Sequence, residues 1–398
     1  MAAALQGCFL IDRIGGAFKG PPEALESRLS AGATALIEQA FADIKPSELR
    51  DHHVHVVGLG TGDSGASVNP KMMSWRHPTH RARALVYLSA AGITDETKAD
   101  NQYVDRLVRL IRTVEGHGKS YLLAFDRHYR PDGTIDAERS NFYTPNEYVV
   151  RLSEAHPDLF LPAISVHPYR PDWRQELEKW ALRGARLIKW LPNAQGMDPA
   201  DPKLDGYYAM MKRYDMTLLS HAGEEQAVEA GDFQELGNPL RLRRPLDQGV
   251  RVIVAHAASL GDNDDLDNPG SRAASFDLFM RMMDNPKYEG LLFGEISAML
   301  QFNRFPDPIL TLMRRKDLHH RLVNGSDYPV PAVNFLINTG DMVDNGMITE
   351  EEQGYLKEIY PYNPLLFDYV AKRTLRVPET GKRLPGHVFT RDPAAKAE

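Results

Sequence analysis

The sequence is poor in cysteine, in long apolar runs and in basic charge. One cysteine stands among 398 residues, so no intramolecular disulfide can form. No apolar run approaches the roughly 20 residues that a membrane-spanning helix needs. Lys and Arg number 47 against 54 Asp and Glu, and the net charge of −7 argues against a nucleic-acid partner, which normally requires a basic face. Neither a phosphate-binding glycine loop nor a serine nucleophile elbow is present.

The context of the single cysteine, Cys8, bears on the cellular location of the protein. Leu5-Gln6-Gly7-Cys8 resembles the cleavage box of bacterial lipoproteins, whose cysteine becomes the lipidated N-terminus. Only seven residues precede Cys8, and they include neither a basic segment nor a long apolar one. We therefore expect a cytoplasmic protein. A lipid anchor on Cys8 is the alternative if the true start lies upstream.

Short apolar segments alternate with helical patterns along most of the chain. Apolar residues make up 42% and charged residues 25%, which is ordinary for a globular protein with a large core. Runs such as 252–255 (Val-Ile-Val-Ala) are apolar on both faces, as strands of a parallel sheet covered by helices must be. Eight such segments predict parallel β/α units and hence a (β/α)8 TIM barrel. We place the strands at 49–58, 120–127, 159–166, 185–191, 216–222, 250–257, 291–297 and 321–327.

The pattern predicts one domain of the α/β class. Residues 1–48 form an N-terminal extension, in which helical periodicity over 23–43 indicates a helix that covers one end of the barrel. Residues 49–375 form the barrel with a C-terminal helical extension, and residues 376–398 form a tail. The end of this tail, 391–398, has low complexity, and we expect it to fray.

Helices and long loops are expected between the strands. Two loops follow strands, over 59–100 and 258–272. The second is acidic, and we favour a solvated surface for it over a lid. The clearest helices lie at 101–116, 172–183, 204–214 and 273–284.

Two histidines occupy alternate positions of the first expected strand. Because side chains alternate across a strand, His53 and His55 point one way while Val54 and Val56 point the other. Two imidazoles on one face, about 6–7 Å apart along the strand, can bind one cation. Alone this motif is weak, since about 0.5 occurrences are expected by chance in a chain with this many histidines.

Three further strands end in a residue that binds metals. His221 closes the fifth strand, His256 closes the sixth and Asp327 closes the eighth. In a (β/α)8 barrel these C-terminal ends lie on one face, which is the face that carries active sites. One histidine at the end of an apolar strand is usually a hydrogen-bonded core residue, but four coordinated strand ends are hard to explain in that way.

This arrangement resembles the metal site of the amidohydrolase superfamily. Asp51-x-His53-x-His55 is similar to its first motif, and 325–329 (Gly-Ser-Asp-Tyr-Pro) is similar to its last. The resemblance extends over 51–367 and includes 362–367, which is similar to the closing helix of the branch that has a bare barrel, the amidohydrolase-2-like branch. It implies a metal-dependent hydrolase that acts on C–N or ester-type bonds.

Lys189 lies in the middle of the fourth strand, where a buried ammonium is costly unless it is paired or neutralised. In binuclear members of the superfamily a strand-four lysine is carboxylated and bridges two metals, which the resemblance allows here. The alternative is that Lys189 pairs with Asp327 and only shapes the pocket. In mononuclear relatives the strand-six histidine, here His256, is a catalytic group beside the metal, so one ion and two ions both remain open.

The ligand set indicates the chemistry. Imidazole and carboxylate ligands without thiolate suit Zn²⁺ best, and Mn²⁺, Fe²⁺, Co²⁺ or Ni²⁺ are also compatible. A divalent cation lowers the pKa of bound water and polarises a substrate carbonyl. Asp327 is the expected proton acceptor and donor, while His256 either binds a second ion or polarises the carbonyl.

Other polar residues near the strand ends are weaker candidates for binding a small-molecule substrate, because loops at a barrel mouth often do so. Glu295 on the seventh strand and Glu225 after the fifth are alternatives for supporting the metal site. The predicted substrate-binding residues are His128, His167, Arg170 and Glu224.

Two other functions compete with the hydrolase. One is a mononuclear decarboxylase of the same superfamily, which a basic pocket with Arg170 or Arg127 would favour. The other is a metal-stabilised binding barrel without activity, against which the presence of both Asp327 and His256 argues. The sequence identifies neither the substrate, as an amide, ester, lactone or phosphoester would suit the site, nor whether the chain forms a homo-oligomer.

Overall fold

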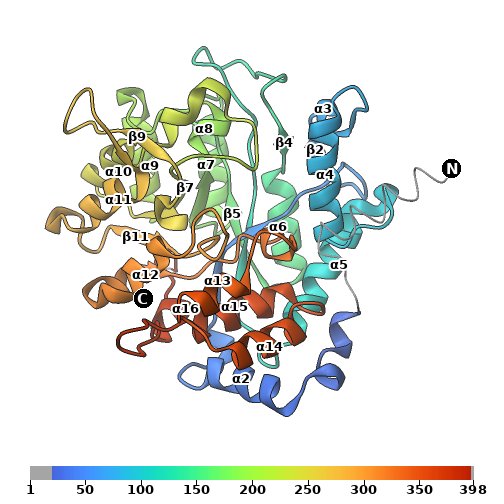
Figure 1. Ribbon diagram of the computed structural model, residues 1–398. Helices are drawn as coiled ribbons and strands as arrows, with labels where there is room; N and C mark the ends of the chain where they lie inside the picture. The colour runs from blue at the N-terminus through green and yellow to red at the C-terminus, as the bar shows by residue number, and fades with distance from the viewer. Residues whose placement is uncertain (1–19, 396–398) are drawn as a thin grey trace.

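The computed structural model describes residues 20–395, and its centre is a barrel of eight parallel strands (Figure 1). The strands pair in chain order, from β1 through β3, β5, β6, β7, β8 and β11 to β12. Val54 bridges Tyr328 in parallel register, and the amide of Asp327 donates to the carbonyl of His53, which joins the last strand to the first. The predicted (β/α)8 TIM barrel is confirmed. The barrel strands are β1 (Arg50–His55), β3 (Lys119–Leu123), β5 (Phe160–Ile164), β6 (Leu187–Trp190), β7 (Thr217–His221), β8 (Val252–Ala255), β11 (Leu292–Glu295) and β12 (Leu322–Val323).

Two small antiparallel ladders lie outside the barrel. The strands β2 (Ser67–Val68) and β4 (Phe142–Tyr143) form one, and β9 (Asp262–Asp264) and β10 (Arg272–Ala274) form the other. The strands β2 and β4 lie in the loops after β1 and β3, and β9 and β10 lie in the loop after β8. All three loops are at the C-terminal end of the barrel.

Helices cover the outer face of the barrel because the outward side chains of the strands are apolar. Trp190 of β6 is fully buried, and its ring lies 5.2 Å from Tyr207 and 6.1 Å from Tyr208. This packing against a helix is the one that alternation predicts for Trp190, opposite Lys189. The helices are α2 (Ala31–Phe41), α3 (Pro70–Met73), α4 (Pro78–Ala90), α5 (Ala99–Arg112), α6 (Asn146–Ala155), α7 (Trp173–Leu182), α8 (Pro192–Gln195), α9 (Asp205–Arg213), α10 (Arg243–Asp247), α11 (Ser275–Met283), α12 (Asp307–Arg314), α13 (Thr339–Asp344), α14 (Glu350–Ile359), α15 (Pro364–Thr374) and α16 (His387–Thr390).

The barrel interior is divided into an apolar floor and a polar top. The floor is a buried cluster of inward-facing side chains from successive strands. One or two positions further along the same strands, the inward residues become Lys189, His221 and Glu295. The polar side chains therefore gather at the C-terminal ends of the strands, above a packed base. The floor consists of Tyr121, Leu123, Ala163, Leu187, Leu219, Ile253, Ala255, Phe293, Val323 and Ala394.

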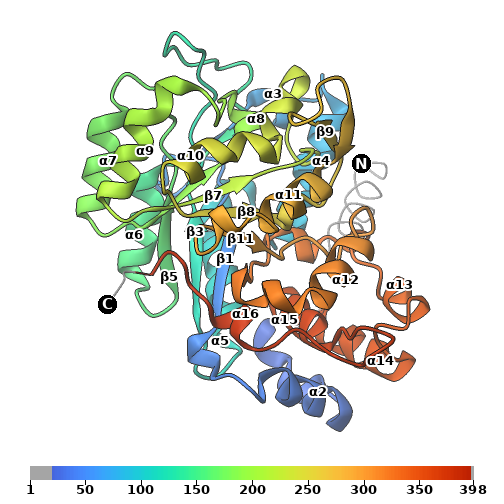
Figure 2. The ribbon, with the colours of Figure 1, turned by 90° about the vertical axis from the view of Figure 1, so that its left-hand side faces the viewer.

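The C-terminal tail closes the bottom of the barrel, so the expectation that it frays from residue 391 is wrong for residues 391–395. Asp392 accepts hydrogen bonds from the Tyr121 hydroxyl at 3.0 Å and lies 3.3 Å from His52 Nε2. Ala394 belongs to the apolar floor, and the Thr217 hydroxyl donates to the carbonyl of Pro393. Figure 2 shows this segment, in red, running from α16 to a point beside β5. The composition of residues 391–398 is typical of a disordered tail, but residues at the open end of the barrel provide hydrogen-bond and apolar partners that order 391–395.

The two expected loops have more structure than predicted. The segment 59–98 contains β2, α3 and α4, and we call it the cap. In 258–272 three acidic side chains pair with arginines: Asp264 lies 2.8 Å from Arg272, the buried Asp265 lies 2.7 Å from Arg281, and Asp267 lies 2.5 Å from Arg243. The expectation of a solvated acidic surface therefore fails for Asp265.

The N-terminal helix is shorter than the predicted 23–43. Two single turns, η1 (Pro22–Ala24) and η2 (Glu26–Arg28), precede it. It begins at Ala31 because the Ser30 hydroxyl accepts the amide of Ala33 and caps the helix. The helix then packs against α14 and α15 at the bottom of Figure 1.

Within residues 20–395 no helix is both long and apolar enough to cross a membrane. Cys8 lies outside the described residues, so the proposal of a lipid anchor stays a prediction.

Candidate metal centre

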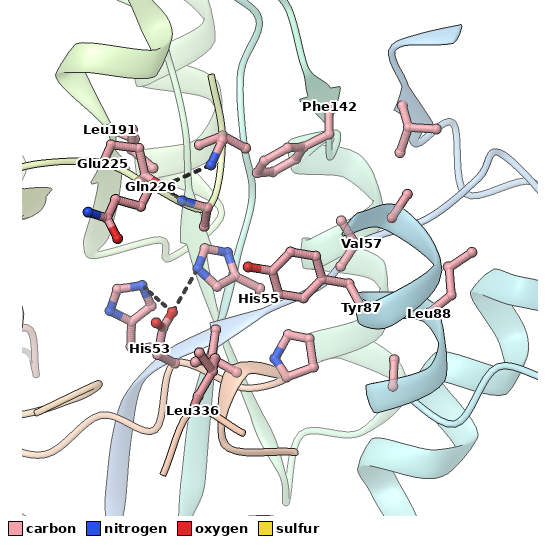
Figure 3. Close-up of a pocket in the computed structure, with 18 of the residues that line it drawn as sticks. His53, His55, Val57, Tyr87, Leu88, Phe142, Leu191, Glu225, Gln226 and Leu336 are labelled. Atoms are coloured by element: carbon pink, nitrogen blue, oxygen red, sulfur yellow. Dashed lines mark hydrogen bonds and ion pairs between the residues drawn. The ribbon is translucent and has the colours of Figure 1, made fainter. Parts of the chain in front are cut away.

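Six side chains predicted from the sequence meet at the C-terminal end of the barrel. His53, His55, Lys189, His221, His256 and Asp327 all line one cavity. Asp327 Oδ1 lies 3.1 Å from His55 Nε2 and 3.4 Å from His53 Nε2. The rings of His53 and His256 stack at 4.9 Å, and those of His221 and His256 lie 5.4 Å apart. Figure 3 shows His53 and His55 side by side at the base of this cavity.

Glu295 and Ser297 orient two of the imidazoles from below. His53 Nδ1 donates to Glu295 Oε2 at 3.1 Å, and the Ser297 hydroxyl donates to the same oxygen at 2.7 Å. His256 Nδ1 donates to Ser297 Oγ at 2.7 Å. Each ring therefore carries its proton on Nδ1 and directs its Nε2 lone pair toward the cavity, where that of His53 accepts a hydrogen bond from Lys189. Second partners of this kind fix the tautomer of metal-binding histidines.

The electrostatics keep His53, His221 and His256 neutral and Asp327 charged. Burial, and then the Lys189 ammonium, lower the pKa of His53 and of His221 well below the usual value. Burial, and then the Arg304 guanidinium, do the same to the pKa of His256. Burial alone would raise the pKa of Asp327, but His53 and His55 outweigh it and hold the pKa below its ordinary value. Neutral imidazole and charged carboxylate are the forms that bind a metal.

One atom of this cluster has no partner in the protein. His221 Nε2 is buried without a hydrogen bond, and Glu225 Oε2, 3.5 Å away, does not form one with it. A buried polar nitrogen without a partner is costly, and native proteins rarely keep one. His53, His256 and Asp327 offer ligand atoms that all lie within 4.8 Å of one another. The donor set therefore fits a divalent transition metal.

Lys189 is the polar side chain below this cluster. It is 1% exposed, and its Nζ donates to His53 Nε2 at 3.1 Å. Burial lowers the pKa of Lys189 to about 8, although Asp327 and Glu295 act in the opposite direction. The amine is thus close to the ligands and nearer to its neutral form than an exposed lysine.

The backbone is unusual at two of the candidate ligands, His256 and Asp327. His256, Ala257 and Ala258 all have positive φ, at 55°, 46° and 52°, and Asp327 has φ 61°. Residues other than glycine rarely adopt this left-handed conformation, and three in succession are rarer still. Such strain collects at functional sites, where the surrounding structure enforces it. Here it turns the chain sharply at the end of β8 and directs His256 into the cavity.

The cavity above the ligands has a volume of about 360 Å³ and is mostly apolar. The cap forms one wall, and Tyr87 of α4 directs its hydroxyl toward His55 (Figure 3). Burial, followed by Glu225 and Asp327, raises the pKa of Tyr87, so the hydroxyl keeps its proton. The apolar lining includes Val57, Val68, Met72, Met73, Leu88, Ile93, Phe142, Leu191, Val228, Leu260, Phe302 and Leu336.

Arg304 also lines the cavity and was not predicted. It is 9% exposed, and its Nη1 donates to the Ser259 hydroxyl at 3.0 Å. Its Nε has no acceptor, and burial lowers the pKa of the guanidinium despite Asp327 and Glu225 nearby. Arg304 lies in an irregular loop after β11, where no periodicity marks a residue as inward-facing.

The predicted substrate-binding residues lie elsewhere, since none of the four lines the cavity. Both ring nitrogens of His167 are occupied, by the carbonyl of Gln195 and the amide of Tyr169. His128 Nδ1 donates to the carbonyl of Ala194. These histidines hold α8 in place after β6.

The other two candidates, Arg170 and Glu224, also make structural contacts. Arg170 pairs with Asp126 at 3.1 Å and with Asp172 at 2.9 Å. Glu224 packs against Gly261 and accepts a hydrogen bond from Gln226. Arg170 thus fixes the loop after β5.

No family model matches the chain, and no curated protein sequence matches it. Solved structures do. An uncharacterized TIM-barrel protein from Bordetella bronchiseptica is 14% identical with a TM-score of 0.48, covering 78% of this chain and 97% of its own. A probable 2-pyrone-4,6-dicarboxylic acid hydrolase from Acinetobacter baumannii is 13% identical with a TM-score of 0.44, covering 79% and 95%. A 5-carboxyvanillate decarboxylase from Novosphingobium aromaticivorans, with bound manganese, is 12% identical with a TM-score of 0.43, covering 79% and 94%. Other similar structures are an amidohydrolase II and a putative amidohydrolase from Staphylococcus aureus, and identities this low assign no activity to this chain.

Proposed function

We propose that this chain is a metal-dependent hydrolase that holds one or two divalent ions, Zn²⁺ by preference, on His53, His55, His221, His256 and Asp327. These side chains come from four strand ends and converge on one buried point, and this convergence carries the proposal. The unpartnered His221 Nε2 and the left-handed backbone at His256 and Asp327 support it independently. When bound, such an ion polarises a substrate carbonyl and lowers the pKa of water.

Asp327 is the residue to which we assign proton transfer. Its carboxylate is charged, 7% exposed and lies at the base of the cavity, where it can take a proton and return it to a leaving group. His256 presents Nε2 to the same space because Ser297 holds its Nδ1 proton. It is therefore either a further ligand or a partner of the substrate carbonyl.

A decarboxylase is the second candidate function, and one observation favours it. The Arg304 guanidinium is buried at the cavity with free donor capacity, so it can hold a substrate carboxylate. Incubation of metal-loaded protein with a panel of esters, lactones, amides and aromatic acids separates the reactions. Acid released without CO₂ supports the hydrolase, and CO₂ released from an aromatic acid supports the decarboxylase.

Metal analysis tests the site itself. The purified protein should contain one or two equivalents of a divalent transition metal, and His221→Ala should lose most of it. His320→Ala, which removes an exposed histidine at the surface, is the control and should keep its metal. A protein without metal, whose activity is indifferent to strong chelators, would refute the proposal.

Lys189→Ala distinguishes one ion from two. If Lys189 is carboxylated and bridges two ions, the variant should lose the second equivalent, and short carboxylic acids should restore part of it. If Lys189 remains an amine beside His53 and Asp327, metal content should stay near one equivalent and added acids should have no effect.

A further inference from the structure

The cavity above the proposed metal centre has two chemically different ends. One end holds Arg304 beside His221 and His256, and the other is the apolar wall that the cap provides. A ligand that fills both ends must itself have a polar or anionic group at one end and an apolar body at the other.

Arg304 forms no ion pair among residues 20–395, and its buried Nε–H has no acceptor. A buried guanidinium without a paired anion is costly, and its fork of donors matches a carboxylate. The acids whose charges act most strongly on it are already engaged. Asp327 lies 3.1 Å from His55 Nε2 and 3.4 Å from His53 Nε2. Glu225 Oε1 accepts the amides of Ala227 and Val228, and Glu295 accepts donors from below the histidines.

The opposite end offers no such partners. Met72, Met73, Ala84 and Leu88 of the cap face the cavity, and Phe142 and Leu336 extend the apolar surface beside them. At about 30 Å³ per water-sized group, the volume of about 360 Å³ accommodates roughly a dozen non-hydrogen atoms. Apolar burial of this extent favours a hydrocarbon or ring system over a sugar or a small polar acid.

We propose that the ligand of this cavity is an amphiphilic carboxylic acid, with its carboxylate on Arg304 and an apolar body of about eight carbons against the cap. This inference deepens the proposed function, since the acid would be the substrate or product of that site. It concerns binding alone, and so it can be tested whether or not the protein hydrolyses anything.

The first test measures the affinity of butanoate, hexanoate, octanoate and octan-1-ol by calorimetry, on the purified protein and after chelation. Each methylene should strengthen binding about fourfold, which corresponds to about 0.8 kcal/mol. Octanoate should bind more tightly than octan-1-ol in both preparations. Equal affinity for octanoate and octan-1-ol, or octanoate binding that disappears after chelation, would overturn the proposal, since the metal and not Arg304 would then hold the carboxylate.

Two substitutions test the ends separately. Arg304→Gln should weaken octanoate about 10- to 100-fold and leave octan-1-ol unchanged. Arg315→Gln, at a partly exposed arginine outside the cavity, is its control. Ala84→Phe should fill the apolar end and abolish the gain per methylene, whereas Ala82→Phe, on the exposed face of the same helix, should not.

Circular dichroism and thermal melting establish that each variant is folded. If Arg304→Gln fails to fold, Ser259→Ala takes its place, because the Ser259 hydroxyl positions the guanidinium and its loss should weaken octanoate about threefold to tenfold. Unchanged octanoate affinity in the folded Arg304 or Ser259 variant would refute the role of Arg304. Octanoate binding as expected, together with no metal and no turnover, would refute only the proposed function.

Discussion

Glu295 holds no metal in the proposed site, yet its substitution should weaken metal binding. Its carboxylate accepts four hydrogen bonds: Oε2 from His53 Nδ1, the Ser297 hydroxyl and the amide of His256, and Oε1 from the amide of Ser297. Glu295→Gln preserves the shape of the side chain. Whichever way the new amide turns, its NH₂ group faces a donor, so at least one of these hydrogen bonds is lost.

The size of the effect follows from these contacts. Loss of the negative charge makes His53 a weaker base and relaxes its tautomer, and substitutions of this kind typically cost 10- to 100-fold in metal affinity, or about 1.4–2.8 kcal/mol. The unsatisfied buried donor should also lower the free energy of unfolding by about 1–3 kcal/mol. Both losses should appear together, because the same hydrogen bonds cause them.

Competition with a zinc-binding dye measures the affinity, and urea unfolding of the metal-free protein measures the stability. Glu38→Gln, on the exposed face of α2, is the control and should change neither quantity. Zinc affinity within twofold of the unmodified protein in Glu295→Gln would show that Glu295 does not orient His53 for a metal. A stability loss without an affinity loss would make Glu295 a structural residue only.

Three further predictions concern single positions. Asp327→Asn should keep much of the metal but lower turnover about 10²- to 10⁴-fold, the usual value of a positioned general base, and steady-state kinetics on any substrate that the panel identifies would check this. Gly325→Ala should lower the free energy of unfolding in urea by about 1–3 kcal/mol, because a Cβ would overlap the Glu295 carboxylate. Gly354→Ala, in open space on α14, should raise it by about 0.5–1 kcal/mol. Equal effects of the two substitutions would contradict the geometry. Burial acts to raise the pKa of Asp392, but His52 outweighs burial and lowers that pKa, so the carboxylate should stabilise the fold at neutral pH and lose this effect as the pH falls through the lowered pKa. The difference in unfolding free energy between the unmodified protein and Asp392→Asn should therefore narrow from pH 7 toward pH 3. A constant difference would refute this account.

The convergence of the candidate ligands could be predicted because two simple rules combine. Alternation along β1 puts His53 and His55 on one face, and barrel closure brings His221 and Asp327 beside them. Neither rule needs the exact strand ends. An error of two or three residues at a strand boundary does not change which end of the barrel a residue occupies, so these predictions survive boundaries that are shorter than expected.

Local alternation fails where the register shifts. The pairing of β1 with β3 is irregular between Asp51 and Val54, so the neighbouring residues His52 and His53 both face the interior. His52 stacks on Tyr121 in the floor, while His53 reaches the cavity. A bulge of this kind depends on the partner strand, and the sequence of β1 alone does not contain it.

The residues that shape the cavity were missed for a different reason. The helix α4, with Pro78 at its first position, lies in a segment predicted as loop because its apolar residues form no strong stripe. That helix brings Tyr87 to the site. Arg304 and Asp392 lie in irregular segments, where position is decided by the partners that the folded barrel offers. Sequence periodicity is informative about regular elements, and it is silent about these residues.

Several locally unfavourable features lie together at the proposed metal centre. His221 leaves a buried nitrogen unpaired, Lys189 buries an amine against an imidazole, and 256–258 hold three left-handed residues in a row. Each feature costs stability on its own. Two of them become favourable once a cation occupies the space between the side chains: the nitrogen of His221 gains a ligand bond, and the strained turn presents His256 to the ion. One bound cation would account for both. The metal content of the purified protein is therefore the measurement on which the proposed function depends most directly.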